Sequence, residues 1–399
     1  MSQIEINNNL RKIPFIVYVA LCVFFLASVQ ISFLLFDNTV FLSLGLAIVF
    51  FLVCRFHPHI FILKYVSMKM SFLFFLAAIL AQRGNINAYI ECVFIIAPFL
   101  LFLFLKDVYK LDFIIRFNNL LATLVCVSLA FFILHLIGLP LPHYSISWKS
   151  YIFDNYYFFM IIPSTYYALE RFQFIFTEPG YFACLMVFMI ILNKYDFKKW
   201  QVNIYLVALI FTYSLAGYLF FVLGLLPFIF YKSKNKGLYL FILFILLGGF
   251  LILLNSESDN FVTSMFSSRL QFGEDRFSYY NRTSDHFEYW FQNFFIPSGD
   301  WLFGENEAIN QIFSGEGLVG VDLRVYFARY GIFPIIFYFG SMLYYYSKKH
   351  SLFGLWYALI FIIFYFRGYT VMYYMGFPML YIIGLLVFEY EQDTKQRLL

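Results

Sequence analysis

The sequence predicts an all-α, polytopic integral membrane protein with about twelve membrane-spanning helices and two long loops on one side of the membrane. Of its 399 residues, 62% are hydrophobic and only 13% are charged, whereas soluble domains carry about 25% charged residues. The apolar residues also fall in long runs, and a bilayer crossing needs about 20 such residues. The whole chain, residues 1–399, is therefore expected to form a single polytopic membrane domain.

The expected spans follow the apolar runs in chain order. They lie near residues 14–36, 39–54, 61–81, 88–105, 119–139, 179–193, 201–213, 216–231, 237–254, 322–346, 351–366 and 369–388. The third run is the least apolar, because Lys64 and Lys69 lie in its first half. Only the segment "SLAG" separates the seventh and eighth runs, which predicts a tight hairpin between them.

The basic residues predict the orientation of these spans, because cytoplasmic loops carry an excess of lysine and arginine. With both termini in the cytoplasm, the inner side carries 18 of the 27 basic residues and the outer side carries 9. The sequence therefore favours a multi-pass membrane protein with cytoplasmic termini.

The kind of basic residue also differs between the two sides. Lysine outnumbers arginine 14 to 4 on the inner side, whereas eight of the nine outer residues are arginines. A planar guanidinium binds phosphate or carboxylate through two parallel hydrogen bonds and keeps its charge when half-buried. The outer side is therefore predicted to hold an oxyanion, although each single arginine is equally explained by snorkelling to the interface or pairing with an acid.

Residues 140–178 form the first long outer loop, a Tyr- and Phe-rich, amphipathic segment that ends at "FTEPGYFA". Pro179 suits the first turn of a helix, and Glu178 lies next to the positive end of the helix dipole. Glu178 is a candidate general base because it faces the arginine-bearing side. Its position at a helix start explains it equally well.

Residues 255–321 form the second long outer loop, the most polar part of the chain. If "RFSYYNRTSDHFEYWFQNFF" is helical, Arg282, His286 and Tyr289 share one face of the helix. The segment "PSGDWLFGENE" is then expected to end that helix in a turn. Asp322 follows the loop, and the arginines of this region are Arg269, Arg276, Arg282, Arg324 and Arg329.

Several other functions find no support in the sequence. The segment "GEGLVG" at residues 315–320 matches a nucleotide-binding pattern, but no strand precedes it, so we interpret it as a loop. His57 and His59 lack the further ligands that a metal site needs. The net charge of +4 is modest and fits loop orientation better than nucleic-acid binding. We therefore expect no metal, no cofactor and no nucleic-acid partner.

Four segments together resemble the bacterial O-antigen polymerase (Wzy) family, which is related to the O-antigen ligases. They are "FTEPGYFA", the small-residue hairpin "SLAGYLFFVLGLL", the long segment "NRTSDHFEYWFQNFFIPSGDWLFGENE" and the entry to a span, "VYFARYGIFPIIFYF". The resemblance extends to the layout of about a dozen spans with two large periplasmic loops. Ligases usually carry a histidine just before the last motif, where this chain has Asp322, which favours a polymerase.

The resemblance implies a metal-independent glycosyltransferase that joins undecaprenyl-pyrophosphate-linked repeat units at the periplasmic face. Donor and acceptor would both be lipid-linked glycans in the bilayer, and a chain-length regulator is a further expected partner. Preorganised arginines can stabilise the leaving pyrophosphate, and a carboxylate or imidazole must accept the proton of the attacking hydroxyl. The candidate bases are Glu178, His286 and Asp322, and the candidate pyrophosphate ligands are Arg282, Arg324, Arg329, Arg269 and Arg276.

Two alternatives remain open on the sequence. An O-antigen ligase would use the same donor with a different acceptor. A lipid-linked oligosaccharide flippase also has about twelve spans, but carriers place charged residues at mid-membrane depth and often show two similar halves. The expected spans here carry almost no charge in their interiors, and no internal repeat is visible.

Overall fold

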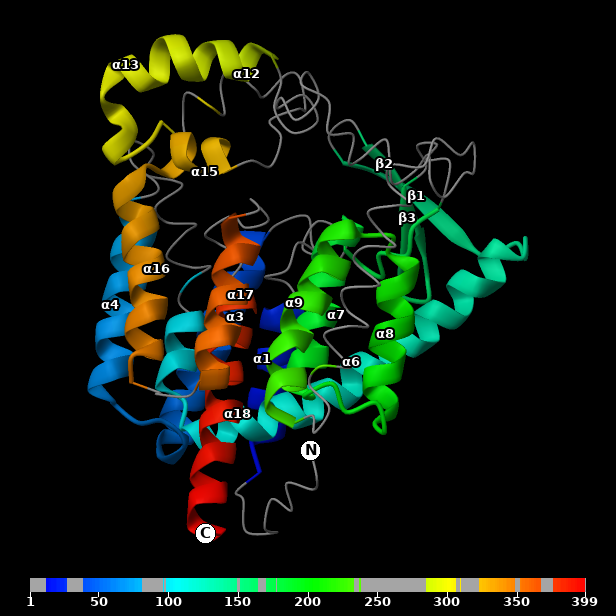
Figure 1. Ribbon diagram of the computed structural model, residues 1–399, viewed down its shortest axis with the longest axis horizontal. Coiled ribbons are helices and arrows are strands. Elements are labelled where there is room, and N and C mark those ends of the chain that lie inside the picture. The colour runs from blue at the N-terminus through cyan, green and yellow to red at the C-terminus, as the bar shows by residue number, and fades with distance from the viewer. Residues whose placement is uncertain are drawn as a thin grey trace.

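The structure, a computed structural model, describes residues 12–26, 39–80, 96, 98–148, 151–163, 170–176, 178–232, 237, 285–305, 309, 323–348, 352–366 and 376–398. The chain is mostly helical, with few strands. Most of the helices stand side by side in a bundle, with a small sheet and several short helices at its upper end (Figure 1).

The helices of the bundle overlap the predicted apolar runs. They are α1 (Phe15–Leu26), α3 (Thr39–Phe56), α4 (Tyr65–Leu80), α6 (Asp107–Leu136), α7 (Pro179–Leu192), α8 (Trp200–Phe211), α9 (Leu215–Lys232), α16 (Ile332–Tyr346), α17 (Leu352–Phe366) and α18 (Gly376–Leu398). Among the described residues, α6 alone is long and apolar enough to cross a membrane by length and composition, and eight shorter apolar helices accompany it. The number of spans stays a prediction.

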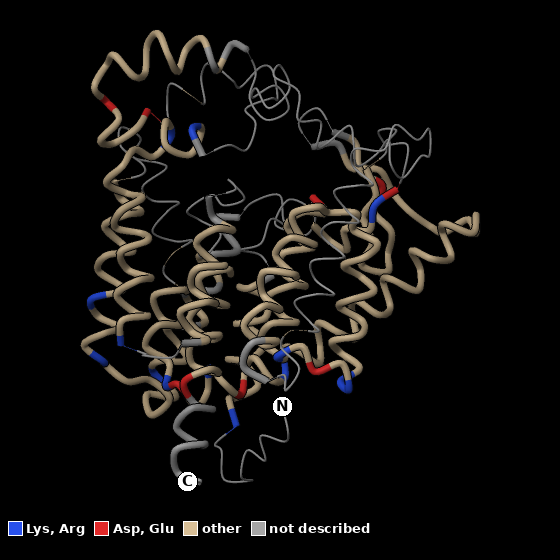
Figure 2. Tube along the Cα trace, viewed as in Figure 1, with Lys and Arg blue, Asp and Glu red and all other residues tan. Residues whose placement is uncertain are grey.

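Charged residues gather toward the two ends of the bundle, and its middle is drawn almost entirely without them (Figure 2). Helix α1 begins and α18 ends at the lower end, where the lysine-rich connection from α7 to α8 also lies (Figure 1). The basic residues described at the upper end are Arg171, Arg324 and Arg329. In the described part of the chain, the basic residues that the sequence assigns to the inner side and those that it assigns to the outer side thus lie at opposite ends of the bundle.

Helix α6 is the exception to the bundle's common direction. It runs obliquely across the lower part of the bundle toward the sheet (Figure 1). The expected span near residues 119–139 is the second half of a 30-residue helix, so Lys110 and Arg116 lie within the helix and not in a loop. Since an α-helix rises about 1.5 Å per residue, α6 is about 45 Å long.

A polar network fastens α6 to the helices it crosses. Asn118 of α6 and Asn193, which follows α7, exchange hydrogen bonds of 3.0 and 3.3 Å. The Tyr205 hydroxyl of α8 donates to both the backbone oxygen and the side-chain oxygen of Asn118, at 2.8 and 3.0 Å. Buried polar groups need such partners, and this network supplies them where three helices meet.

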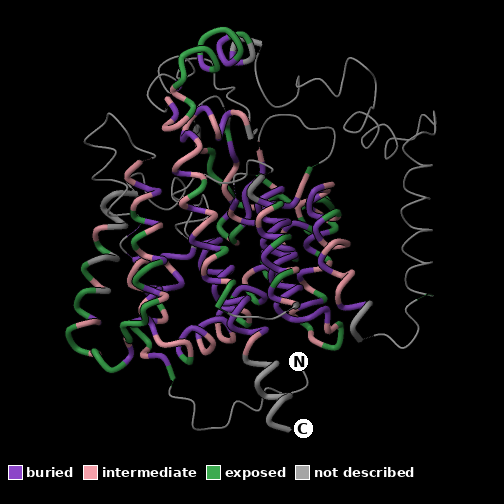
Figure 3. The backbone as a smooth tube through the Cα atoms, turned by 60° about the vertical axis from the view of Figure 1, so that its left-hand side comes forward, coloured by how far each residue is buried: buried purple, intermediate pink, exposed green. Residues whose placement is uncertain are grey.

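Helix α7 lies at the centre of the bundle. Every residue from Gly180 to Leu192 is buried, and a helix that is apolar all round belongs inside a core. Figure 3 shows the buried residues concentrated in the middle of the bundle, with exposed residues on its outer helices. Two glycines of α9 allow close packing: a Cβ added at Gly217 would lie 2.6 Å from that of Ala183, and one at Gly224 would lie 2.8 Å from Ile191.

The outer helices expose large apolar side chains. Phe51 and Phe56 of α3 are 69% and 73% exposed, and Phe72 of α4 is 65% exposed. Isolated exposed apolar residues are normal on soluble proteins, but here several large ones occur on each of these two helices. The four described cysteines, Cys22, Cys54, Cys126 and Cys184, are thiols that form no disulfide.

The all-α prediction is wrong for the first long loop. Residues within 140–178 form a three-stranded antiparallel sheet in the order β1 (His143–Trp148), β2 (Tyr151–Tyr156) and β3 (Met160–Pro163). His143 pairs with Tyr156 and Trp148 with Tyr151. The strands are rich in aromatic and β-branched residues, which suit a pleated sheet. The Ser128 hydroxyl of α6 donates to the Phe159 carbonyl at 2.8 Å and anchors the sheet to the bundle.

The described part of the second loop forms a helical segment above the bundle. It comprises α12 (Asp285–Trp290), a π-helical turn at Phe291–Phe295 and α13 (Ile296–Ser298). Gly299 has φ 77° and ends the helix, which confirms the predicted break at "PSGDW". The expected span 322–346 is two helices, α15 (Leu323–Tyr330) and α16, divided at Gly331, which has φ 73° and ψ 176°.

Candidate functional site

Helix α15 lies at the upper end of the bundle, above α16 (Figure 1). It presents two faces with different partners. Val325 and Ala328 are buried in a small apolar cluster with Phe287 and Phe295 of the α12–α13 segment. Tyr326 and Tyr330 belong instead to the main core of the bundle. The short helix is therefore held from both sides, and Arg324 and Arg329 are placed on it half-buried.

A glycine contact fixes the turn after α13 to the end of α15. A Cβ added at Gly304 would lie 2.5 Å from the Gly331 nitrogen and 2.7 Å from the Arg329 carbonyl oxygen. The Glu305 N–H donates to the Ala328 carbonyl at 2.7 Å, and the Gly304 N–H donates to the Asp300 carbonyl at 2.8 Å. The turn at Asp300–Glu305 thereby lies directly against the arginine-bearing helix.

Two buried polar atoms of α15 have no hydrogen-bond partner among the described residues: Nε of Arg329 and the hydroxyl oxygen of Tyr326. Residues three apart lie on the same side of a helix. Most buried polar groups in proteins are paired, and one left unpaired costs about 1–3 kcal/mol. Because the Arg329 N–H can only donate and the Tyr326 hydroxyl can also donate, an oxyanion is a chemical group that would satisfy either of them.

The turn that lies against α15 carries two acidic residues, Asp300 and Glu305. Burial raises the pKa of Glu305, and the charge of Asp300 and a hydrogen bond with it raise that pKa further. A carboxyl group with a raised pKa is suited to proton transfer near neutral pH. The sequence did not single out either residue as a candidate for chemistry; the one local signal is that this acidic pair flanks "WLFG".

Glu178 lies immediately before α7, as predicted. Its backbone is extended, Pro179 occupies the first turn, and its carboxylate makes no capping hydrogen bond to the helix. The side chain is exposed. Helix α7 stands nearer the middle of the bundle, whereas α15 lies at one side of it (Figure 1). The structure thus places Glu178 and the two arginines of α15 on separate elements.

Arg171 is an outer arginine with a structural role. Its Nε donates to the Thr212 carbonyl at 2.9 Å and its Nη2 donates to the Tyr213 carbonyl at 3.2 Å. These carbonyls belong to the short turn between α8 and α9, the hairpin that "SLAG" predicts. Tyr213 has φ 46°, a left-handed conformation that costs a non-glycine residue free energy. Arg171 therefore stabilises this turn.

The structure describes only some of the remaining candidate residues predicted from the sequence. Residues Arg269, Arg276, Arg282 and Asp322 lie outside the described residues, as does the segment 315–320. His286 lies in α12, next to Phe287, which packs toward α15. His57 and His59 lie with their ring centroids 5.8 Å apart. No group of three or more His, Cys, Asp or Glu residues able to hold a metal ion occurs within the described ranges.

Comparison of the chain with protein-family models, with curated proteins and with solved structures finds no match in any of the three.

Proposed function

We propose that the protein is a membrane glycosyltransferase that polymerises lipid-linked oligosaccharide repeat units, as its resemblance to the O-antigen polymerases implies. The observation that carries the proposal is that two buried polar atoms of the short helix α15, Arg329 Nε and the Tyr326 hydroxyl oxygen, each lack a hydrogen-bond partner in the described part of the chain. A diphosphate has oxyanions for both donors, and Arg324 on the same short helix adds a second positive charge. Arginine binds phosphate through two parallel hydrogen bonds.

The proposed setting is the bacterial inner membrane, with the lower end of the bundle in the cytoplasm. The uncharged middle of the bundle (Figure 2) and the exposed aromatic side chains of α3 and α4 support it. Apolar side chains at such positions would face lipid. The site on α15 would then lie on the periplasmic side, where lipid-linked repeat units are presented.

In the proposed reaction, a hydroxyl of the acceptor glycan attacks the anomeric carbon of the donor glycan. The new glycosidic C–O bond forms as the bond from that carbon to the undecaprenyl pyrophosphate oxygen breaks. Arg329, Arg324 and the Tyr326 hydroxyl stabilise the negative charge that develops on the pyrophosphate. The proton of the attacking hydroxyl passes to a carboxylate or imidazole. Glu178, His286 and Asp322 are the bases predicted from the sequence, and Glu305 joins them.

The test replaces Arg329 by glutamine in the native host and separates the surface glycolipids by size. If the protein is a polymerase, the Arg329→Gln cells carry single repeat units in place of long chains. The matched control is Arg55→Gln, which removes an exposed arginine at the lower end of α3 and should leave the long chains unchanged. Immunoblots of membranes would establish equal amounts of each variant.

Other outcomes of the same experiment favour the alternatives. Loss of every repeat unit from the surface would indicate a ligase or a flippase, because the product would then fail to reach or join its acceptor. An unchanged distribution of chain lengths at equal protein amounts would contradict a role for Arg329 in holding the leaving group.

A further inference from the structure

The lower ends of α4 and α16 bring two lysines to one aromatic ring. The two helices pack side by side, with the rings of Phe74 and Tyr338 in edge contact, their centroids 5.0 Å apart. Lys69 Nζ lies 4.4 Å from the ring centroid of Tyr65 and 5.7 Å from that of Tyr344. Lys348 Nζ also lies 5.7 Å from the Tyr344 centroid. We define these four polar residues, Tyr65, Lys69, Tyr344 and Lys348, as the lysine–tyrosine cluster.

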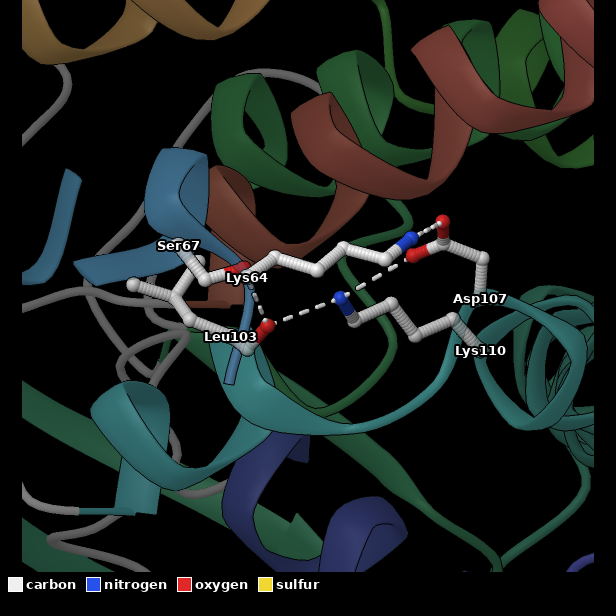
Figure 4. A network of polar contacts seen from close by, with 5 residues as sticks. All are labelled: Lys64, Ser67, Leu103, Asp107 and Lys110. Atoms are coloured by element: carbon white, nitrogen blue, oxygen red, sulfur yellow. Dashed lines mark hydrogen bonds and ion pairs between the residues drawn. The ribbon is translucent and has the colours of Figure 1, made fainter. Parts of the chain in front are cut away.

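Three basic residues at this end of the bundle, Lys64, Lys110 and Arg116, pair with carboxylates of the protein. Lys64 pairs with Asp107, and the buried Lys110 lies 3.5 Å from the same carboxylate (Figure 4). The Leu103 carbonyl accepts a further hydrogen bond of 3.0 Å from Lys110. Arg116, further along α6, pairs with Asp112 at 3.0 Å. Each of these cations therefore has an anionic partner supplied by the chain.

The lysine–tyrosine cluster differs in this respect. Within the described residues, neither Lys69 nor Lys348 forms an ion pair with a carboxylate. Both side chains are exposed. A hydrogen bond with Tyr65 and contacts with the rings of Tyr65 and Tyr344 hold Lys69, and Lys348 also lies near the Tyr344 ring. Aromatic faces attract ammonium groups but leave their charge available to an anion from outside the chain.

The surface around the cluster is apolar. Leu63, Tyr65, Met68 and Phe72 on or beside α4 are 78%, 67%, 52% and 65% exposed, and Leu343 on α16 is 47% exposed. A soluble anion gains nothing from such neighbours, whereas a phospholipid has acyl chains that would cover them. Basic residues between membrane helices on the cytoplasmic side are known positions for anionic headgroups.

We propose that the lysine–tyrosine cluster binds the phosphate of an anionic phospholipid headgroup. Lys69 and Lys348 contribute the positive charge from two helices, and the rings of Tyr65 and Tyr344 form the walls of the site. The acyl chains extend along Phe72 and Leu343. The proposal is independent of the reaction proposed above and requires only that the bundle lies in a bilayer.

The test measures lipid retention on the purified full-length protein by native mass spectrometry and its melting temperature in detergent. Phosphatidylglycerol and phosphatidylcholine are added separately. The wild type should retain phosphatidylglycerol and be stabilised by it in preference to phosphatidylcholine. The double variant Lys69→Gln/Lys348→Gln should bind phosphatidylglycerol about tenfold more weakly, because each lysine near an anionic lipid contributes appreciably to its binding.

Two further variants define the controls. Lys12→Gln/Lys198→Gln removes the same charge from two other exposed lysines and should bind phosphatidylglycerol like the wild type. Lys69→Arg/Lys348→Arg keeps the charge and should also retain the lipid, which separates loss of binding from loss of folding.

Three results would overturn the proposal. The first is full phosphatidylglycerol preference in Lys69→Gln/Lys348→Gln. The second is an equal loss in Lys12→Gln/Lys198→Gln, because the effect would then follow total charge and not this cluster. The third is equal stabilisation by glycerol phosphate or inorganic phosphate at the same concentration, which would identify a soluble anion as the ligand.

Discussion

The backbones of Gly304 and Gly331 meet so closely that a Cβ at Gly304 would lie 2.5 Å from the Gly331 nitrogen. Both residues also have left-handed backbones, with φ 71° and 73°. This contact joins the turn that carries Asp300 and Glu305 to the end of the helix that carries Arg324 and Arg329. The resemblance to the polymerases rests partly on these two segments, "FGENE" and "ARYGIF", whose glycines are 27 positions apart in the sequence.

We expect Gly304→Ala to lower the melting temperature and to shorten the surface glycan chains, because the added methyl group collides with backbone atoms that cannot rotate away. The control is Gly299→Ala. Gly299 has a similar φ of 77°, but a Cβ there meets nothing within 4 Å, so only the cost of the left-handed backbone, about 1–2 kcal/mol, applies. Equal melting temperatures for the two variants would show that the contact does not matter.

Arg329→Met should separate stability from activity. The variant removes a buried Nε that has no hydrogen-bond partner among the described residues, so the free energy of unfolding should stay within about 1 kcal/mol of the wild-type value or increase. If the proposed function is right, polymerisation should be lost, because the proposed oxyanion ligand is gone. The measurements are thermal melting of the purified protein and the length of surface glycans.

In contrast to Arg329→Met, Arg171→Met should lower stability. Its two hydrogen bonds to the Thr212 and Tyr213 carbonyls should make this substitution cost about 2–3 kcal/mol of unfolding free energy. A strong loss of stability in Arg329→Met with little loss in Arg171→Met would reverse the roles assigned to the two arginines.

Glu305→Gln should stabilise the protein at neutral pH. Burial and Asp300 raise the pKa of Glu305, so the folded state binds this proton more tightly than the unfolded state does. The resulting penalty is absent below the unfolded pKa, grows as the pH rises from the unfolded to the raised pKa, and is complete above the raised pKa. The stabilisation by Glu305→Gln should therefore vanish in acid, below the ordinary glutamate value of 4.5.

Melting curves between about pH 4 and pH 8 would check this prediction. In an Asp300→Asn background the benefit of Glu305→Gln should shrink, because one cause of the raised pKa has been removed. A benefit of constant size at every pH would show that the substitution acts through packing and not through ionisation.

Tyr205→Phe should weaken the attachment of α6 to α8. The substitution removes the hydroxyl that donates to both oxygens of Asn118 at 2.8 and 3.0 Å and should cost about 1–2 kcal/mol. Tyr289→Phe is the matched control, since Tyr289 is 62% exposed. Thermal melting in detergent would measure both; equal melting temperatures would contradict the importance of the network.

The positions of the bundle helices followed from local features of the sequence. Long apolar runs exclude extended loops, Pro179 suits the first turn of α7, and the few polar residues between Phe211 and Leu215 leave room only for a turn. Gly299 likewise ends the helix that precedes it. These features act within a few residues, so the sequence predicts them directly.

The sheet at residues 143–163 does not follow from the sequence, because it depends on contacts between segments and not on neighbours within a few residues. Its strands alternate aromatic with small or polar residues, as in "HYSISW", but the aromatic content of the whole chain masks that alternation. The sheet is stabilised by the pairing of its three strands with one another and by the hydrogen bond from Ser128 of α6 to the Phe159 carbonyl. These partners become visible only when the chain is folded.

By itself, then, the sequence determined many of the helical segments and, in the described part of the chain, the separation of charged residues between the two ends of the bundle. The tertiary structure decided which of the outer arginines is already paired: Arg171 binds the carbonyls of a turn, whereas Nε of Arg329 has no partner in the part of the chain that the structure describes. It also decided that Gly304 lies against Gly331. The physical reason is range: helix formation depends on neighbours along the chain, whereas the pairing of a side chain depends on distant segments that packing brings together.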